Sequence, residues 1–171
     1  MKSILELIEA SKEDLPDIYC DMDEVLVDFR GGAAKVIGGS FVDTEKKLRW
    51  DKINQTKNFW VNLDWMPGAK RLYQFLAKYD THILSAYTDK NPPSRVGKMK
   101  WLDKNTKVKR ANRHLVLRSQ KQFYATTAGK PNILIDDYDK NINEWEAKGG
   151  IGIHHISIGK TISELKRLGF K

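Results

Sequence analysis

The sequence has little cysteine and no long apolar run, and these absences exclude several classes of protein. Its 171 residues contain one cysteine, Cys20, which cannot form an internal disulfide and lies in an apolar stretch typical of a core strand. No apolar run approaches the roughly 20 residues that span a bilayer. Residues 1–10 follow the pattern of an acidic amphipathic helix rather than a signal peptide. We therefore expect neither a disulfide-rich secreted protein nor a membrane protein, and we expect a cytoplasmic location.

Charge is the most uneven property of the chain. The net charge is +8, but between Arg95 and Lys121 ten basic residues accompany one acid, Asp103, so this segment carries +9 and the rest of the chain −1. Such a segment attracts a polyanion or a phosphorylated substrate, or it is simply a solvated helix and loop. The sequence thus leaves nucleic acid open as a partner through residues 95–121, and it leaves the oligomeric state open.

Short apolar stretches alternate with helical patterns along the chain. This alternation predicts an α/β fold with five parallel strands in one central sheet and helices on both faces. In such sheets the ligand site lies beyond the carboxyl ends of the strands. The predicted strands are 17–20, 81–86, 114–117, 132–135 and 151–155, and the predicted helices are 68–78, 94–103, 121–126, 140–148 and 161–168, the last with a capping box from Thr161 to Glu164.

The stretch 30–66 interrupts this alternation. It contains a glycine-rich part, a charged helical part at 43–51, and a cluster of aromatic and amide residues. It is too long for a bare connection within one domain. We therefore predict a small helical cap at 30–66, placed over the strand ends of a core made of 1–29 and 67–171.

Polar side chains follow four of the five predicted strands. Because the carboxyl ends of parallel strands share one rim, we expect these side chains to lie together. Carboxylates are the ligands that Mg²⁺ prefers, while a lysine and a hydroxyl suit a phosphoryl group. In chain order they are Asp21 with Asp23, Ser85, Lys121, and Asp136 with Asp137.

The order of these motifs resembles the haloacid dehalogenase superfamily of aspartyl-phosphate phosphohydrolases. The resemblance is closest to its 5'(3')-deoxyribonucleotidase family, of the phage and bacterial type. It implies a Rossmann-like three-layer sandwich with a cap inserted after the first strand. The stretches that carry it are Asp21-x-Asp23-x-Val25 within 21–29, Phe59–Leu63, Met66–Ala69, Ser85, Arg118–Lys121 and Leu134–Asp137.

The resemblance also implies roles for the polar residues. Asp21 would be the nucleophile, and Asp23 would act as general acid and base while its backbone carbonyl binds the metal. Ser85 and Lys121 would hold the phosphate, with Lys130 as an alternative lysine. Mg²⁺ would be bound by Asp21, Asp23, Asp136 and Asp137, and the sequence leaves open which of the last two coordinates directly.

Substrate choice is expected from the cap and from the end of the second strand. In proteins of this family the cap supplies aromatic residues that stack a base, and Phe59 and Trp60 suit that role. The alternative is that these rings merely form the core of a small subdomain. Ser85, Ala86, Tyr87 and Lys121 are the other expected substrate contacts. His154 and His155 are adjacent on a strand, so they face opposite sides and are expected to be structural.

Three functions follow in order of preference. The first is a Mg²⁺-dependent phosphomonoesterase acting on deoxyribonucleoside monophosphates, a small-molecule substrate. The second is a phosphatase acting on nucleic-acid ends, which the basic segment 95–121 favours. The third is a nucleic-acid-binding module without turnover, which is disfavoured because every expected catalytic group is present.

Overall fold

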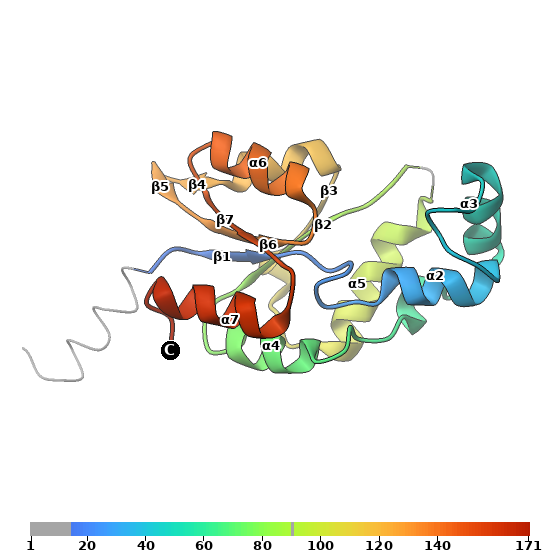
Figure 1. Ribbon diagram of the computed structural model, residues 1–171, viewed down its shortest axis with the longest axis horizontal. Coiled ribbons are helices and arrows are strands. Elements are labelled where there is room, and N and C mark those ends of the chain that lie inside the picture. Colours follow the sequence, from blue (N-terminus) through green and yellow to red (C-terminus); the bar gives the residue numbers. More distant parts are fainter. Residues whose placement is uncertain (1–14, 90) are drawn as a thin grey trace, which may run out of the picture.

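A central parallel sheet forms the middle layer of the protein. The computed structural model describes residues 15–89 and 91–171, so the predicted helix at 1–10 lies outside the described residues. The strand order is β3-β2-β1-β6-β7, and all four neighbouring pairs are parallel, which confirms the predicted sheet (Figure 1). Each strand lies within one residue of its predicted bounds: β1 (Ile18–Cys20), β2 (His82–Ala86), β3 (Arg113–Val116), β6 (Ile133–Asp136) and β7 (Ile151–His154).

Helices cover both faces of this sheet, so the three-layer α/β architecture is also confirmed. Helices α4 (Ala69–Leu76) and α7 (Ile158–Arg167) lie on one face, and α6 (Asp139–Ala147) lies on the other (Figure 1). The inner strands are apolar because both of their faces are buried: no residue of β1 is more than 6% exposed. Cys20 is fully buried in β1, as expected of a residue in a core strand.

The segment between β1 and α4 forms the predicted helical insertion at one end of the molecule (Figure 1). Its two ends are held together, because Asp28 N donates to Asp64 O at 2.9 Å and Met66 N donates to Leu26 O at 2.8 Å. The insertion therefore leaves and rejoins the core at one place, although its boundaries as a domain stay a prediction. Its helices are α2 (Phe29–Ile37), α3 (Lys46–Gln55, against a predicted 43–51) and the 3₁₀ helix η1 (Trp60–Asn62).

Helix α5 (Pro93–Asn105) connects the insertion to the core. Trp101 Nε1 donates to Leu63 O at 2.8 Å, so the helix is fixed to the C-terminal part of the insertion. The backbone approaches closely here: a Cβ at Gly97 would lie 2.4 Å from the Cβ of Trp60. Glycine thus permits the contact between α5 and η1.

Two predicted helices differ from the structure. Residues 121–126 belong to a 3₁₀ helix, η3 (Arg118–Tyr124), and to an unpredicted hairpin of β4 (Thr126–Thr127) and β5 (Lys130–Pro131). The last helix begins at Ile158 and not at Thr161, because the Ser157 hydroxyl accepts the Lys160 N–H and caps it. Thr161 is fully buried and its hydroxyl contacts His155 Nδ1 at 2.7 Å, so the predicted capping box was wrong.

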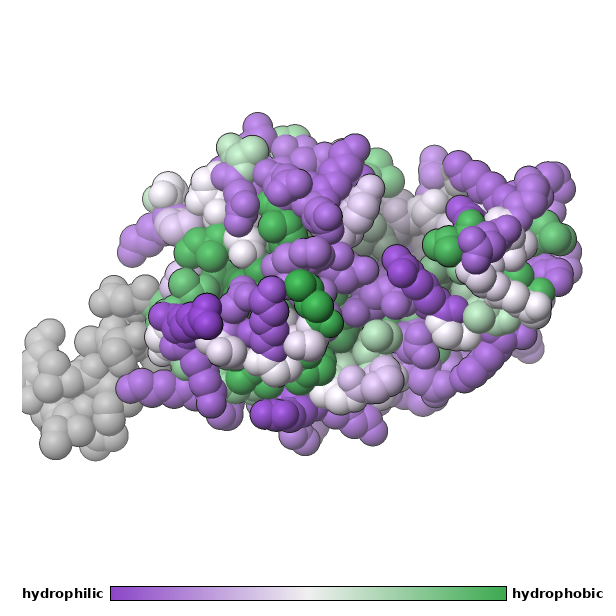
Figure 2. Space-filling view, viewed as in Figure 1, coloured by the Kyte–Doolittle hydropathy of each residue, from purple (hydrophilic) through white to green (hydrophobic). Residues whose placement is uncertain are grey.

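Figure 2 shows polar residues over most of the face on view. Within residues 15–89 and 91–171, no helix combines the length and apolarity needed to cross a bilayer. The remaining short element, the 3₁₀ helix η2 (Arg110–Asn112), leads into β3.

Candidate active site

Asp21 lies at the carboxyl end of the central strand β1. Its backbone N–H donates to Ile135 O at 2.9 Å, which extends the pairing of β1 with β6 and fixes the side chain at the rim of the sheet. One carboxylate oxygen, Oδ1, accepts the Met22 N–H at 2.8 Å and lies 3.1 Å from Lys121 Nζ. Asp21 is therefore a buried carboxylate with two fixed donors.

The turn after Asp21 aims Asp23 at the same rim. The N–H groups of Val25, Leu26 and Val27 all point to the Met22 carbonyl, at 2.8 to 3.3 Å. The apolar side chains of these three residues are fully buried, and their packing in the core holds the turn in place. Hereafter residues 21–27, which hold the expected nucleophile Asp21 and the expected general acid Asp23, are called the catalytic turn.

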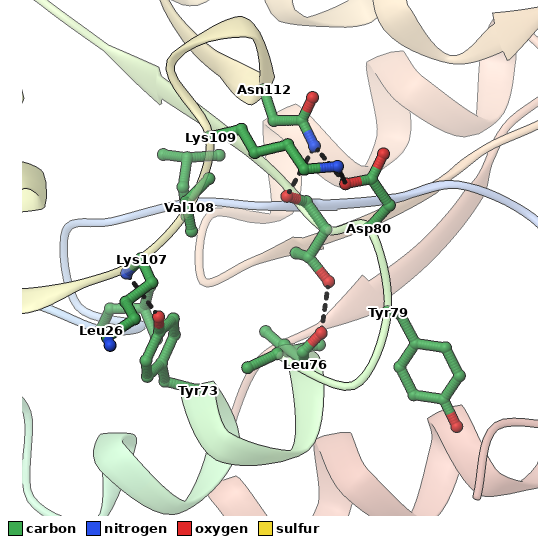
Figure 3. A pocket seen from close by; sticks show the side chains of 12 residues that line it. Leu26, Tyr73, Leu76, Tyr79, Asp80, Lys107, Val108, Lys109 and Asn112 are labelled. Carbon is green, nitrogen blue, oxygen red and sulfur yellow. Dashed lines mark hydrogen bonds and ion pairs between the residues drawn. The ribbon is translucent and has the colours of Figure 1, made fainter.

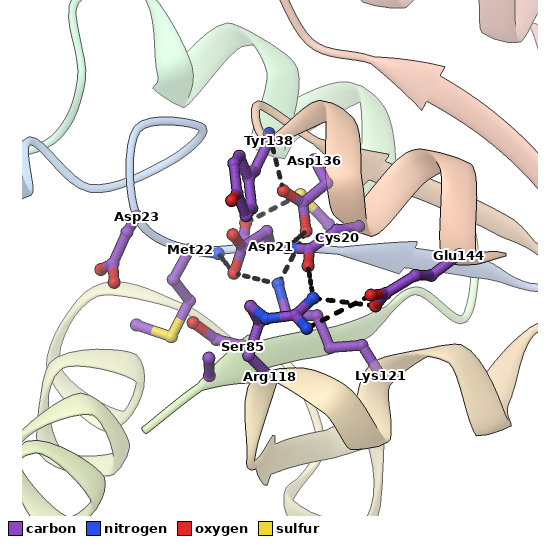
Figure 4. Close-up of polar contacts among 12 residues, drawn as sticks. Cys20, Asp21, Met22, Asp23, Ser85, Arg118, Lys121, Asp136, Tyr138 and Glu144 are labelled. Carbon is purple, nitrogen blue, oxygen red and sulfur yellow. Dashed lines mark hydrogen bonds and ion pairs between the residues drawn. The ribbon is translucent and has the colours of Figure 1, made fainter. Parts of the chain in front are cut away.

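Lys121 lies between two of the carboxylates. Its ammonium is 2.7 Å from Asp136 Oδ2 and 3.1 Å from Asp21 Oδ1, and its side chain is almost fully buried (Figure 4). Burial alone would lower the pKa of Lys121, but Asp21 and Asp136 raise it well above its usual range. Lys121 is thus a permanent cation in the site. Lys130, the alternative lysine, lies exposed in the β4–β5 hairpin.

Three carboxylates form a group that suits a hard cation. Asp21, Asp136 and Asp137 each offer an oxygen, and these oxygens lie within 4.8 Å of one another. Burial raises the pKa of Asp137 to about 7, with the charges of Asp21 and Asp136 adding to the effect. Burial and Asp21 likewise raise the pKa of Asp136. One lysine therefore does not neutralise the group, and an oxygen-ligated divalent cation would.

Asp136 is fixed by three donors, one from η3 and two from the start of α6. Besides Lys121, its oxygens accept the Tyr138 N–H and the Asn141 side-chain amide, each at 2.9 Å. Asn141 in turn accepts from Arg118, which forms a bidentate ion pair with Glu144. Sequence reasoning missed Asn141, although it lies on the buried face of α6 beside Ile142 and Trp145.

Lys98 is the main functional residue that sequence reasoning missed. It lies on α5, is 2% exposed, and its ammonium is 2.7 Å from Asp23 Oδ2 and 3.2 Å from Ser85 Oγ. It also donates to Ala86 O at 2.7 Å. A signal existed, because a lysine stands in the buried stripe Ser94, Gly97, Lys98, Trp101 and Leu102 of this helix.

Asp23 combines an ion pair with an unused oxygen. Burial raises the pKa of Asp23, and Lys98 opposes that shift. Its Oδ1 is buried, and among the described residues it is one of two such side-chain atoms without a hydrogen-bond partner, the other being Arg49 Nε. An oxygen of this kind is available to a ligand or a water.

The structure also gathers the expected substrate contacts from β2. Ser85 is fully buried and, with Ala86, contacts Lys98. Tyr87 follows β2, and its ring lies 5.4 Å from the Arg95 guanidinium. Figure 4 shows Ser85, Lys121, Asp21 and Asp136 converging, with Asp23 to one side.

Phe59 and Trp60 lie in an aromatic cluster within the insertion. Each is 6% exposed, and Trp60 stacks on Phe29 with ring centroids 5.3 Å apart. The Trp60 Nε1 donates to Asn91, and the Lys98 ammonium lies 5.1 Å from the Trp60 ring. The rings thus form the core of the insertion while contacting the residue that binds Asp23, and base stacking by them stays a prediction.

The basic segment 95–121 is largely paired internally. Lys98 and Lys121 point into the site, and Arg113 is bound by Asp103 at 2.6 Å and by Val108 O. Arg110, Lys109 and Arg118 also pair, with Asp103, Asp80 and Glu144. These pairs reduce the positive charge that the segment presents to a polyanion.

Two other features take no part in the contacts among the carboxylates and Lys121. His154 contacts Asp137 O and Asp139, whereas His155 contacts Thr161, so the two rings serve different partners. A mostly apolar pocket of about 170 Å³ opens where β2 begins, with Tyr73, Leu76 and Asp80 among its lining residues (Figure 3). That is the opposite end of β2 from Ser85, so this pocket is separate from the carboxylate group.

No family model matches the chain. A protein of Vibrio phage KVP40 named "Putative 5'(3')-deoxyribonucleotidase" is 32% identical over 139 residues, which cover 81% of this chain and 75% of that protein.

Two crystal structures of hydrolases share the fold. The one from Streptococcus pneumoniae TIGR4 has a TM-score of 0.55 at 12% identity, covering 89% of this chain and 98% of that one. The one from Pseudomonas syringae has a TM-score of 0.52 at 16% identity, covering 91% and 90%.

Proposed function

Because the chain belongs to the 5'(3')-deoxyribonucleotidase family and is a haloacid dehalogenase-type phosphohydrolase, we propose that it hydrolyses deoxyribonucleoside monophosphates with Mg²⁺. The observation that carries this proposal is the buried group of Asp21, Asp136 and Asp137 around Lys121. A divalent cation complements the three carboxylates, and the Lys121 ammonium complements a phosphoryl oxygen.

Asp21 attacks the phosphorus and forms an aspartyl-phosphate while the nucleoside oxygen leaves. Lys121 and Ser85 donate to the phosphoryl oxygens, and their burial makes each donated hydrogen bond stronger than in water. Asp21, Asp136, Asp137 and the carbonyl of Asp23 would hold Mg²⁺, which supplies neutralisation of the phosphoryl charge. Lys121 also keeps Asp21 in place during the attack.

Asp23 protonates the leaving oxygen and then takes a proton from the water that hydrolyses the aspartyl-phosphate. Its raised pKa favours a carboxyl that carries a proton, and its unpartnered Oδ1 suits contact with the leaving oxygen. Lys98 orients the other oxygen and stabilises the carboxylate that Asp23 becomes when it gives up its proton. In this proposal Asp21 is the nucleophile and Asp23 transfers protons, the roles that the family resemblance implies.

The insertion favours a mononucleotide. Its aromatic cluster lies against α5 and Lys98, and Tyr138, which is 51% exposed, follows the metal-binding pair Asp136 and Asp137. The exposed ring of Tyr138 beside the carboxylates suits a nucleoside better than a simple phosphate ester. A phosphatase on nucleic-acid ends is the second candidate, supported by Lys100, Lys104 and Lys107, exposed basic residues of the segment 95–121. We also propose a cytoplasmic location.

A phosphate-release screen tests the proposal. It compares 5'- and 3'-mononucleotides, ribo and deoxy, with 5'- and 3'-phosphorylated oligonucleotides, each in Mg²⁺ and in EDTA. We expect release from dTMP or dUMP that EDTA abolishes, and that Asp21→Asn abolishes without changing the melting temperature by more than a few degrees. Asp51→Asn, at an exposed carboxylate of α3, is the matched control.

Two outcomes would contradict parts of the proposal. Full activity of Asp21→Asn removes Asp21 from the role of nucleophile. Faster release from phosphorylated oligonucleotides than from every mononucleotide transfers the assignment to nucleic-acid ends.

A further inference from the structure

Glu24 has an unusual backbone for its residue type. Its φ angle is +60°, in the left-handed region that glycine and asparagine adopt readily and that other side chains rarely do. The residue is in the middle of the catalytic turn, between Asp23 and Val25. A side chain retained at such a position often has a function that outweighs the strain.

The Glu24 carboxylate binds the first helix of the insertion. Its Oε1 accepts the Arg30 N–H at 2.7 Å, in the first turn of α2. The backbone N–H of Glu24 donates to Val27 O at 2.8 Å, so the residue also belongs to the turn that positions Asp23. Glu24 is thus bonded both to the catalytic turn and to the insertion.

Helix α2 matters because it carries Phe29. This ring stacks on Trp60 and contacts Phe59 edge-on, with centroids 6.1 Å apart in the second pair. The position of α2 therefore sets the position of the aromatic cluster, and through Trp60 its distance from Lys98. Asp28 caps the same helix by accepting the Gly31 N–H at 2.8 Å, but it makes this bond as the ordinary N-cap residue.

We propose that Glu24 is a positioning residue that fixes the insertion to the catalytic turn and thereby sets the affinity for the nucleoside part of the substrate. The substrate half of this statement rests on the proposed function, whereas the link between turn and helix does not. The observation that carries it is a half-buried carboxylate held at a strained backbone position while it bonds α2.

The test replaces Glu24 in two ways. Glu24→Asn keeps a residue that tolerates the left-handed backbone but is too short to reach Arg30, and Glu24→Gln keeps both the length and an acceptor oxygen. Asp28→Ala is the matched control, because it removes one hydrogen bond from the same helix end. Steady-state kinetics are measured on dTMP and on p-nitrophenyl phosphate, which has no nucleoside, together with amide hydrogen exchange in residues 29–37.

We expect Glu24→Asn to raise KM for dTMP at least tenfold with kcat within twofold, and to leave KM for p-nitrophenyl phosphate within twofold. Exchange in 29–37 should become faster, the melting temperature should stay within a few degrees, and Glu24→Gln should restore both readouts. Asp28→Ala should speed exchange in 29–37 while leaving KM for dTMP within twofold.

Two results would overturn the proposal. One is an unchanged KM and unchanged exchange in Glu24→Asn, and the other is an equal loss on both substrates. If the unaltered protein releases phosphate from no nucleotide, the proposed function fails, and the exchange measurement alone still decides whether Glu24 binds the insertion to the turn.

Discussion

Replacing Lys121 by methionine should make the stability of the protein depend more strongly on Mg²⁺ than that of the unaltered protein. Methionine fills a similar volume, so the main change is loss of a buried cation 2.7 Å from Asp136 and 3.1 Å from Asp21. Removing one partner of a buried ion pair costs about 3–5 kcal/mol, because the remaining charge is left uncompensated. For a chain of this size that is a fall of about 6–20 °C in melting temperature.

Mg²⁺ should restore part of this loss. It can compensate the same carboxylates, and at a hundred times its Kd it stabilises the folded state by about 2.7 kcal/mol. Turnover should still fall by about 10²–10³, the usual cost of removing one donor to a developing charge. The assay is thermal unfolding in EDTA and in MgCl₂, followed by phosphate release at a temperature where both proteins are folded.

Lys130→Met is the control, because this lysine is exposed in the hairpin and touches none of the carboxylates. It should leave both the melting temperature and turnover nearly unchanged. An unchanged melting temperature for Lys121→Met in EDTA would refute the electrostatic reasoning, as would equal losses in the two variants.

Two further predictions concern pH and packing. The pKa of Asp137 is about 7 in the folded protein against 3.8 ordinarily, so between these pH values the folded state holds a proton that the unfolded state has lost. In EDTA the free energy of unfolding should therefore fall as pH rises from 4 to 7, and thermal melts should show this slope. A flat profile, or a slope that Asp137→Asn leaves unaltered, contradicts the prediction. Gly97→Ala places a Cβ 2.4 Å from the Cβ of Trp60 and should lower the free energy of unfolding by about 1–3 kcal/mol. Gly159→Ala is the control, because no atom lies within 4 Å of the added Cβ, and it should not lower stability. Equal melting temperatures for the two variants would show that α5 moves away from Trp60 at no cost.

The strands and the carboxylates were predictable because each has a local signal. Short apolar runs mark strands buried on both faces, and a carboxylate directly after such a run, as at Asp21 and Asp136, is costly unless it has a use. The order of strands along the chain then determines which ends meet. These features depend on hydrophobicity and on neighbouring residues alone.

The other features depend on contacts between distant residues. Lys98 stands in a basic run that suggests a solvated surface, and only its position on the buried stripe of α5 reveals that it binds Asp23. Thr161 has the sequence pattern of a helix cap, but its hydroxyl is taken by His155, so Ser157 caps the helix. The predicted helix at 121–126 was wrong for a similar reason. The Asn132 side-chain amide donates to Tyr124 O and to the Thr127 hydroxyl, and these hydrogen bonds stabilise the hairpin that replaces the end of the helix.

The closed stem of the insertion has a consequence for how proteins of this architecture diverge. Backbone hydrogen bonds join Leu26 to Met66 and Asp28 to Asp64. The insertion is therefore a loop whose two ends are held together at the core. Lengthening such a loop costs little, because the entropy of closure grows only with the logarithm of its length. The inserted segment can therefore change in length and sequence during evolution while the sheet and its carboxylates keep their positions.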